Sequence, residues 1–224
     1  MQSFEDILAE AVRRKGSAEA VMAAATKPKS DEELAAIPSS GWLSQIARGI
    51  FQAGISWQVV DAKWPEITEA FEGFDVGKVS MFDEDRLSEL VNDRRVIRSG
   101  PKILAIRENA SFIRRVGEKE GGFATKIAHW PASDFVGLLD WLASNGSRLG
   151  GTTGQYVLRF MGKESFILSR DVVARLTAEG VISGPATSKK ALAAIQAAFN
   201  RWKDESGHNF NTISRVLAQS IGEG

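Results

Sequence analysis

The sequence contains no cysteine among its 224 residues. This absence excludes disulfides, cysteine-ligated zinc, cysteine-ligated iron–sulfur clusters and a cysteine nucleophile. Histidine is scarce as well, since the chain has only His129 and His208, and their spacing matches no metal-binding motif. We therefore expect neither a metal site nor a cofactor.

Long hydrophobic runs are also missing. No stretch approaches the apolar length that spans a bilayer. The N-terminal segment MQSFEDILAEAVRRKG carries acids early and lacks the apolar core of a signal peptide. We expect no membrane partner and a cytoplasmic location, which also fits the lack of cysteine.

The chain has no excess of charge of either sign, because 28 Lys and Arg balance 28 Asp and Glu. A nucleic-acid-binding protein is often basic overall, so this balance argues mildly against one. The distribution is uneven, however: seven basic residues lie between positions 94 and 115, with Glu108 as the single acid. This basic stripe fits either a face that follows phosphates or an ordinary solvated helix face.

Helical patterns dominate what is present. Apolar residues recur at helical spacing, and the segment 3–16 runs from a Ser cap to a Gly stop. Residues 42–64 are typical of two helices joined by a turn at Gly54. No alternating strand pattern and no repeat is evident. The sequence predicts an all-α protein with roughly ten helices and short loops.

The segment RLGGTTGQYVLRFMG predicts a hairpin between two helices. Gly150 and Gly151 can adopt backbone angles that are closed to other residues. Thr152 and Thr153 follow where a helix begins, and the first N–H groups of a helix have no intrahelical partner. This turn is either a phosphate site at a helix N-terminus or a simple capped turn between packed helices.

A carboxylate follows at the head of the next helix, in FILSRDVVARL. Ser169 or Asp171 could cap that helix. Alternatively, Asp171 does chemistry, because a carboxylate can stabilise a developing positive sugar and orient a water that attacks it.

Residues from about 42 to 176 resemble the helix-hairpin-helix DNA glycosylase superfamily, in which a glycine hairpin precedes a helix and an aspartate follows a short loop. Here LGGTTGQYVLRFMG matches the hairpin, and Asp171 falls at the aspartate. The blocks FQAGISW, with Trp57, and GTTGQY, with Tyr156, are similar to those of the 3-methyladenine DNA glycosylase I family.

The chain departs from that family in ways that make it look like a diverged member. It lacks the cysteines of the family's structural zinc site, and Gly49 stands where the family has a base-reading glutamate. The glycosylase I family itself lacks the superfamily aspartate that Asp171 matches. The resemblance therefore implies the reaction, whereas the choice of base stays open, with alkylated purines as the family's usual substrates.

The implied reaction is hydrolysis of the N-glycosidic bond of a damaged base in double-stranded DNA, after the nucleotide has left the stack. Asp171 would stabilise the sugar and position the water. Bifunctional relatives carry a lysine nucleophile on the hairpin helix, whereas Thr153 stands near that place here. The resemblance implies a monofunctional glycosylase, although Lys163 lies nearby in the sequence.

The other site residues follow from the same resemblance. Trp57 would stack on the flipped base, in a pocket that Trp42 and Gln45 also line, unless Trp57 is a core tryptophan. Ile55, or else Gln52, would be the wedge that fills the gap in the duplex, unless Ile55 only packs on the core. The predicted phosphate contacts are Gly150, Gly151, Thr152, Thr153 and Gly154 of the hairpin, with Arg98 and Lys102.

The implied architecture has two helical lobes that flank a cleft. We predict that residues 1–40 pack with a C-terminal lobe, that residues 41–165 form the central lobe, and that residues 166–224 complete the second lobe. We expect a monomer that acts in base excision repair on bacterial nucleoid DNA. Two alternatives remain open: an inactive module of this fold that binds DNA or a modified nucleotide, and a helical interaction protein without a nucleic-acid role.

Overall fold

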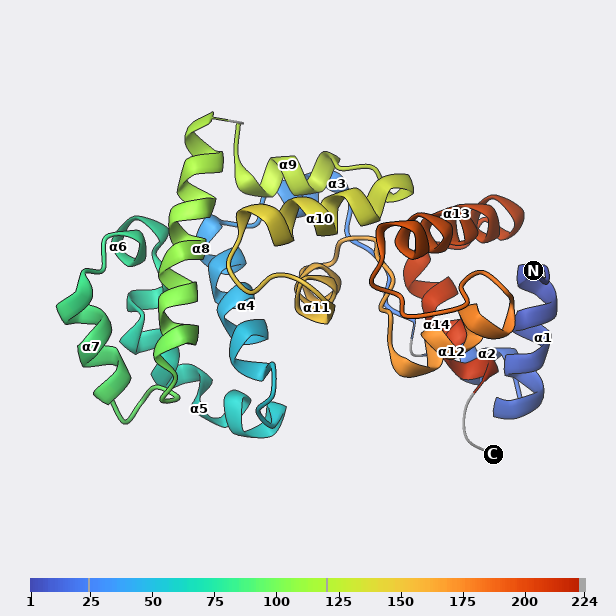
Figure 1. Cartoon of the computed structure of the whole chain (residues 1–224), viewed down its shortest axis with the longest axis horizontal. Coiled ribbons are helices and arrows are strands. Elements are labelled where there is room, and N and C mark those ends of the chain that lie inside the picture. Colours follow the sequence, from blue (N-terminus) through green and yellow to red (C-terminus); the bar gives the residue numbers. More distant parts are fainter. Residues whose placement is uncertain (24, 120, 222–224) are drawn as a thin grey trace. The chain divides into compact units, whose positions relative to one another are not determined.

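The computed structural model describes residues 1–23, 25–119 and 121–221. These residues form fourteen α-helices and two short 3-10 helices, and none of them lies in a β-strand (Figure 1). This confirms the predicted all-α class. Among the described residues, no helix is long and apolar enough to cross a membrane, and no group of three or more metal-ligating side chains is placed to hold a metal ion.

The chain divides into two compact units. The first unit contains Met1–Lys29, Trp130–Leu138 and Gly162–Gly224, and the second contains Ser30–His129 and Leu139–Met161. The predicted boundary at 40/41 falls after the division between Lys29 and Ser30, and the one at 165/166 falls after the division between Met161 and Gly162; the segment Trp130–Leu138 lies inside the predicted central lobe. The first unit is therefore built from both ends of the chain and from one short internal segment.

The second unit is a cluster of helices around an aromatic core. Trp42 meets Phe123 edge-on with ring centroids 5.7 Å apart, and Phe71 stacks on Phe74 at 5.4 Å. Its elements are α3 (Asp31–Ala35), α4 (Ser39–Gln52), α5 (Trp57–Ala70), η1 (Glu72–Phe74), α6 (Val76–Ser80), α7 (Glu84–Asn92), α8 (Gly100–Lys119), α9 (Phe123–His129), α11 (Thr152–Met161) and the latter part of α10 (Phe135–Asn145).

The first unit has its own aromatic core. Phe166 stacks on Phe199 with centroids 4.2 Å apart, and Trp202 meets Phe199 edge-on at 5.7 Å. The elements of this unit are α1 (Phe4–Lys15), α2 (Ala18–Met22), η2 (Ala132–Asp134), the start of α10, α12 (Arg170–Ala178), α13 (Lys189–Ser206) and α14 (Phe210–Ser220).

Local capping explains why several helices begin and end as predicted. Ser3 accepts a hydrogen bond from the Asp6 N–H at the start of α1, and Gly16 ends that helix with a φ of 90°. The described residues contain more helices than the roughly ten predicted. One example is α3, in a stretch rich in Pro, Lys and Ser, where Ser30 and Glu33 form a reciprocal capping box.

Candidate functional site

The predicted hairpin is present in the second unit. After α10 ends at Asn145, the loop turns through Arg148 (φ 58°) and Gly151 (φ 59°), and α11 begins at Thr152. Gly154 brings the backbone close, because a Cβ at this position would lie 2.5 Å from the carbonyl oxygen of Leu149. Only glycine fits there, so the loop geometry depends on Gly151 and Gly154 for different physical reasons.

The residues at the tip of this hairpin are accessible. Gly150, Gly151 and Thr152 are exposed and Thr153 is half-buried. The N–H groups in the first turn of α11 have no intrahelical acceptors, and the positive end of the helix dipole adds to their attraction for anions. The tip can therefore receive a phosphate.

A polar cavity of about 610 Å³ lies beside the start of the hairpin loop, and part of the basic stripe lines it. Arg107 and Arg115 line it, together with Glu108, two serines and the turn at Asn145–Ser147. Other members of the stripe are paired: Arg95 contacts Asp93 at 2.8 Å. The stripe is thus part open basic surface and part local ion pairs.

The turn between α4 and α5 carries the two predicted wedge residues. Gly54 adopts a φ of 80°, Ile55 is half-buried, and the Gln52 amide donates to Asp61 Oδ1 at 3.2 Å. Lys102 on α8 fastens this turn, since its ammonium donates to the carbonyl oxygens of Phe51 and Ala53 at 3.0 and 2.6 Å.

Lys102 on α8 and Arg98 just before it are the two other predicted phosphate-binding residues, and their surroundings differ. Burial lowers the pKa of Lys102, and the positive charge of Arg148 lowers it further. Arg98 is exposed. The internal hydrogen bonds of Lys102 give it a clear structural task, so its contact with DNA stays a prediction, as does that of Arg98.

Trp57 is 43% exposed and belongs to an aromatic cluster on the surface of the second unit. Its ring meets Tyr156 edge-on at 5.5 Å and Phe160 at 5.7 Å. Phe160 is itself 50% exposed. Tyr156 and Phe160 are four residues apart on α11, so the sequence spacing places them on one helix face, although it does not place them beside Trp57. Large exposed aromatic rings offer a surface on which a base can stack.

Trp42 and Gln45, the other predicted pocket residues, lie on α4. Trp42 is fully buried, and its indole N–H has no hydrogen-bond partner among the described residues. Gln45 is half-buried. The position of Trp42 is that of a core residue, so its assignment to a base pocket remains a prediction without structural support.

Gly49 is the residue predicted to stand where the family has a base-reading glutamate, and the structure shows why a small residue fits here. A Cβ at Gly49 would lie 3.0 Å from Val157 Cγ2 and 3.6 Å from Thr153 Cγ2. Helix α4 therefore packs directly against α11 at this point. A longer side chain would have to push the two helices apart.

Asp171 lies in the first unit, as the second residue of α12. The N-cap of this helix is Ser169, whose hydroxyl accepts a hydrogen bond from the Val172 N–H at 3.3 Å. The Asp171 side chain is 46% exposed, with one carboxylate oxygen 3.9 Å from Arg170 Nε. Of the two capping residues considered, Ser169 does the capping, and the carboxylate of Asp171 is left accessible.

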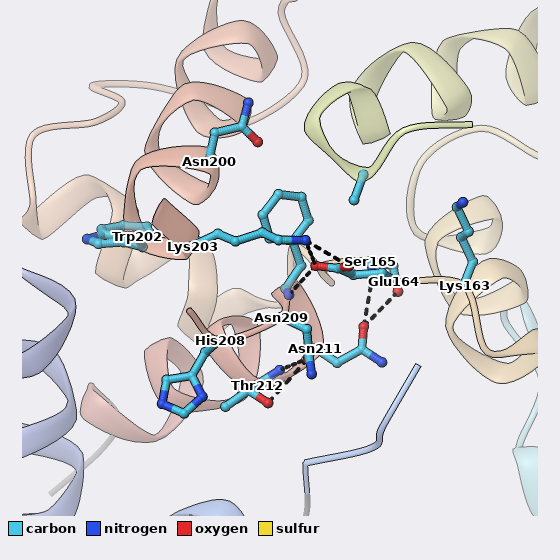
Figure 2. A network of polar contacts seen from close by, with 12 residues as sticks. Lys163, Glu164, Ser165, Asn200, Trp202, Lys203, His208, Asn209, Asn211 and Thr212 are labelled. Atoms are coloured by element: carbon cyan, nitrogen blue, oxygen red, sulfur yellow. Dashed lines mark hydrogen bonds and ion pairs between the residues drawn. The ribbon is translucent and has the colours of Figure 1, made fainter. Parts of the chain in front are cut away.

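The irregular segment before α12 is held by polar side chains of α14. Figure 2 shows Asn211 Oδ1 accepting from the Ser165 N–H, at 2.9 Å. One turn later, Ser214 Oγ accepts from the Ile167 N–H at 3.1 Å. These hydrogen bonds replace the partners that a strand would provide. They fix the backbone that leads into Asp171.

Charged residues complete this anchorage (Figure 2). Glu164 accepts from Lys203 Nζ at 2.7 Å and from the Phe210 N–H at 3.0 Å. Lys163 is 4% exposed and donates to the Trp130 carbonyl oxygen at 2.6 Å. Lys163 therefore serves the interior of the first unit.

Comparisons with known proteins agree with this fold. A variant of 3-methyladenine DNA glycosylase I in complex with 3-methyladenine is 22% identical, with a TM-score of 0.50 over 56% of this chain and 77% of that one. A variant of the same enzyme from Staphylococcus aureus is 20% identical, with a TM-score of 0.49 over 55% and 77%. The first of these two matches shows that the fold is the all-α DNA glycosylase fold of that enzyme.

Residues 43–135 match the family model of the methyladenine glycosylases. This match confirms the resemblance to the 3-methyladenine DNA glycosylase I family. It covers α4, α5 and α8, including Trp57, and ends before the hairpin and Asp171.

Proposed function

We propose that this protein is a monofunctional DNA glycosylase that hydrolyses the N-glycosidic bond of a damaged, alkylated base in double-stranded DNA, as a monomer in base excision repair. The hairpin carries this proposal. Its left-handed Gly151 leads directly into the exposed start of α11, and the same helix bears Tyr156 and Phe160 against Trp57. A phosphate site and a stacking surface are thereby joined on one short element.

In the proposed reaction, the damaged nucleotide leaves the duplex, and Ile55 or Gln52 fills the gap. The bond between C1′ and the base breaks, and the base departs with the electron pair. Asp171 stabilises the positive sugar and orients a water. The water oxygen bonds to C1′, and its proton passes to the carboxylate and then to solvent.

Lys163 supports the monofunctional assignment. A lyase step needs a neutral amine within reach of C1′. The ammonium of Lys163 is buried and donates to a backbone carbonyl, and Thr153 has no amine. We therefore expect an intact abasic strand as the product.

The test is base release from duplexes that carry 3-methyladenine, 7-methylguanine, hypoxanthine, ethenoadenine or uracil, with alkali added to reveal abasic sites. Asp171→Asn is compared with wild type. We expect release from at least one alkylated base and a fall in rate of about 10²–10⁴-fold in the variant. Strand cleavage without alkali would contradict the monofunctional assignment.

The packing at Gly49 favours a second candidate, a module that binds DNA or a modified nucleotide without cleaving it. The position of the family's base-reading glutamate is filled by the contact with Val157. Under this alternative no lesion releases its base, and Asp171→Asn binds DNA as wild type does.

A further inference from the structure

Asp171 borders a small cavity that lies wholly within the first unit. The cavity measures about 260 Å³ and is lined by α1, α12 and α14. Three of its side chains are basic: Arg14, Lys15 and Arg215. Among the described residues that line it, Asp171 is the only acid, and basic side chains outnumber it by three to one.

Helix chemistry accounts for only some of these cations. Arg14 and Lys15 lie in the last turn of α1, where basic residues interact favourably with the helix dipole. Arg215 lies in the middle of α14, where the dipole has little effect. Its placement beside the end of α1 therefore needs another explanation.

The acid that precedes these cations on α1 is engaged elsewhere. Glu10, one turn before Arg14 on α1, pairs with Arg175. Among the described residues, no ion pair joins Lys15 or Arg215 to an acid, and both side chains belong to exposed residues. Positive charges lining a concave surface attract anions.

We infer that Lys15 and Arg215 form a subsite for a backbone phosphate of DNA, next to the nucleotide on which Asp171 acts. This inference rests on the proposed function. A carboxylate repels the phosphates that flank its target sugar, and the two cations on the same cavity wall offset that repulsion. A phosphate held there also fixes the attached sugar near the Asp171 carboxylate, since the two are covalently joined.

The test compares the double variant Lys15→Gln/Arg215→Gln with Arg13→Gln. Arg13 is an exposed neighbour on α1 and is not among the residues that line the cavity. Binding to a fluorescein-labelled duplex with a tetrahydrofuran abasic analogue is measured by fluorescence anisotropy at several salt concentrations. Because the cavity variant loses two positive charges, the control also carries Arg201→Gln, on α13, and loses two as well.

We expect the cavity variant to weaken binding about tenfold more than the control at about 0.1 M salt. The slope of log K against log salt should fall by about 1, as for one lost phosphate contact. Equal affinities and equal slopes for the two double variants would overturn the subsite. Circular dichroism checks that both variants fold.

Binding to the abasic duplex needs no base release, so this test is separate from that of the proposed function. Base release by wild type, with the cavity variant binding as the control does, removes the subsite and leaves the enzyme. Selective loss of binding without release from any lesion keeps the phosphate subsite and removes the glycosylase.

Discussion

The side chain of Asn109 forms hydrogen bonds with both the N–H and the carbonyl oxygen of Ser147. Its side-chain amide donates to the Ser147 carbonyl oxygen at 2.8 Å, and its Oδ1 accepts from the Ser147 N–H at 3.0 Å. Asn109 is fully buried on α8. One side chain therefore ties the long helix to the beginning of the hairpin loop.

Replacing Asn109 by Leu should loosen the hairpin, because two partly buried backbone groups of Ser147 lose their partner. We expect the free energy of unfolding to fall by about 2–4 kcal/mol. Hydrogen exchange should show faster opening of the amides at 147–151. The matched control is Asn92→Leu, since exposed Asn92 bonds only to the Ser88 carbonyl oxygen. Equal exchange in both variants would contradict the anchoring role.

Ser169 and Asp171 should separate into a structural and a chemical residue. Ser169→Ala removes the N-cap of α12 and should destabilise the protein by about 1 kcal/mol. Asp171→Asn keeps that cap and should change stability by less than about 0.5 kcal/mol while slowing base release. Urea unfolding and the release assay measure the two effects. The assignment fails if the destabilisation follows Asp171 instead.

Truncation of Trp57 should weaken DNA binding, whereas truncation of Trp42 should lower the stability of the fold. Trp57→Ala removes a ring that is 43% exposed, so we expect weaker DNA binding by about 1–3 kcal/mol and little loss of stability. Trp42→Ala empties a core position and should destabilise by about 3–5 kcal/mol. Anisotropy with lesion-containing duplex and thermal unfolding distinguish them. A binding loss in Trp42→Phe, with stability kept, would restore Trp42 to the base pocket.

Gly49→Glu tests whether the family's glutamate can return to this chain. The new side chain would clash with Val157, because even a Cβ at position 49 would lie 3.0 Å from Val157 Cγ2. We expect a loss of about 3 kcal/mol or more, from overpacking and burial of a carboxyl group. Adding Val157→Ala should recover part of that loss. Wild-type stability in the single variant would show that the helices can separate freely.

Glu10 should make the stability of the first unit depend on pH. The hydrogen bond from Arg175 is the main cause that lowers the pKa of the Glu10 carboxyl, while burial opposes it. Its stabilising contribution is complete above the unfolded-state pKa of about 4.3 and is lost as pH falls through the lower folded-state value. Glu10→Gln should therefore flatten the fall in unfolding free energy below about pH 4.3. Glu5→Gln, on an exposed position of the same helix, is the control for this titration.

Local signals explain which parts of the fold could be predicted. The cap at Ser3, the stop at Gly16 and the turn at Gly54 depend on neighbours in the sequence, and the structure places them as expected. The short helix α3 carried a readable Ser–Glu capping box within a stretch of Pro, Lys and Ser. The Pro, Lys and Ser residues around it are typical of a linker, whereas the capping box indicates a helix.

Long-range contacts explain what could not be predicted. The hydrogen bonds from Lys102 to residues about fifty positions earlier leave no periodic trace in the sequence. The approach of Arg215 to the end of α1 depends in the same way on how distant helices pack. The sequence identifies Gly49 only as a missing glutamate, whereas its packing against Val157 appears only in three dimensions.

The discontinuous make-up of the first unit has a consequence for the order of events on the ribosome. The second unit draws on residues 30–161, apart from one short segment, so its helices can assemble before the rest of the chain emerges. The first unit must wait for α14, whose Gln219 donates to the carbonyl oxygen of Val21 at 3.0 Å. The N-terminal helices therefore leave the ribosome first and find their partners last.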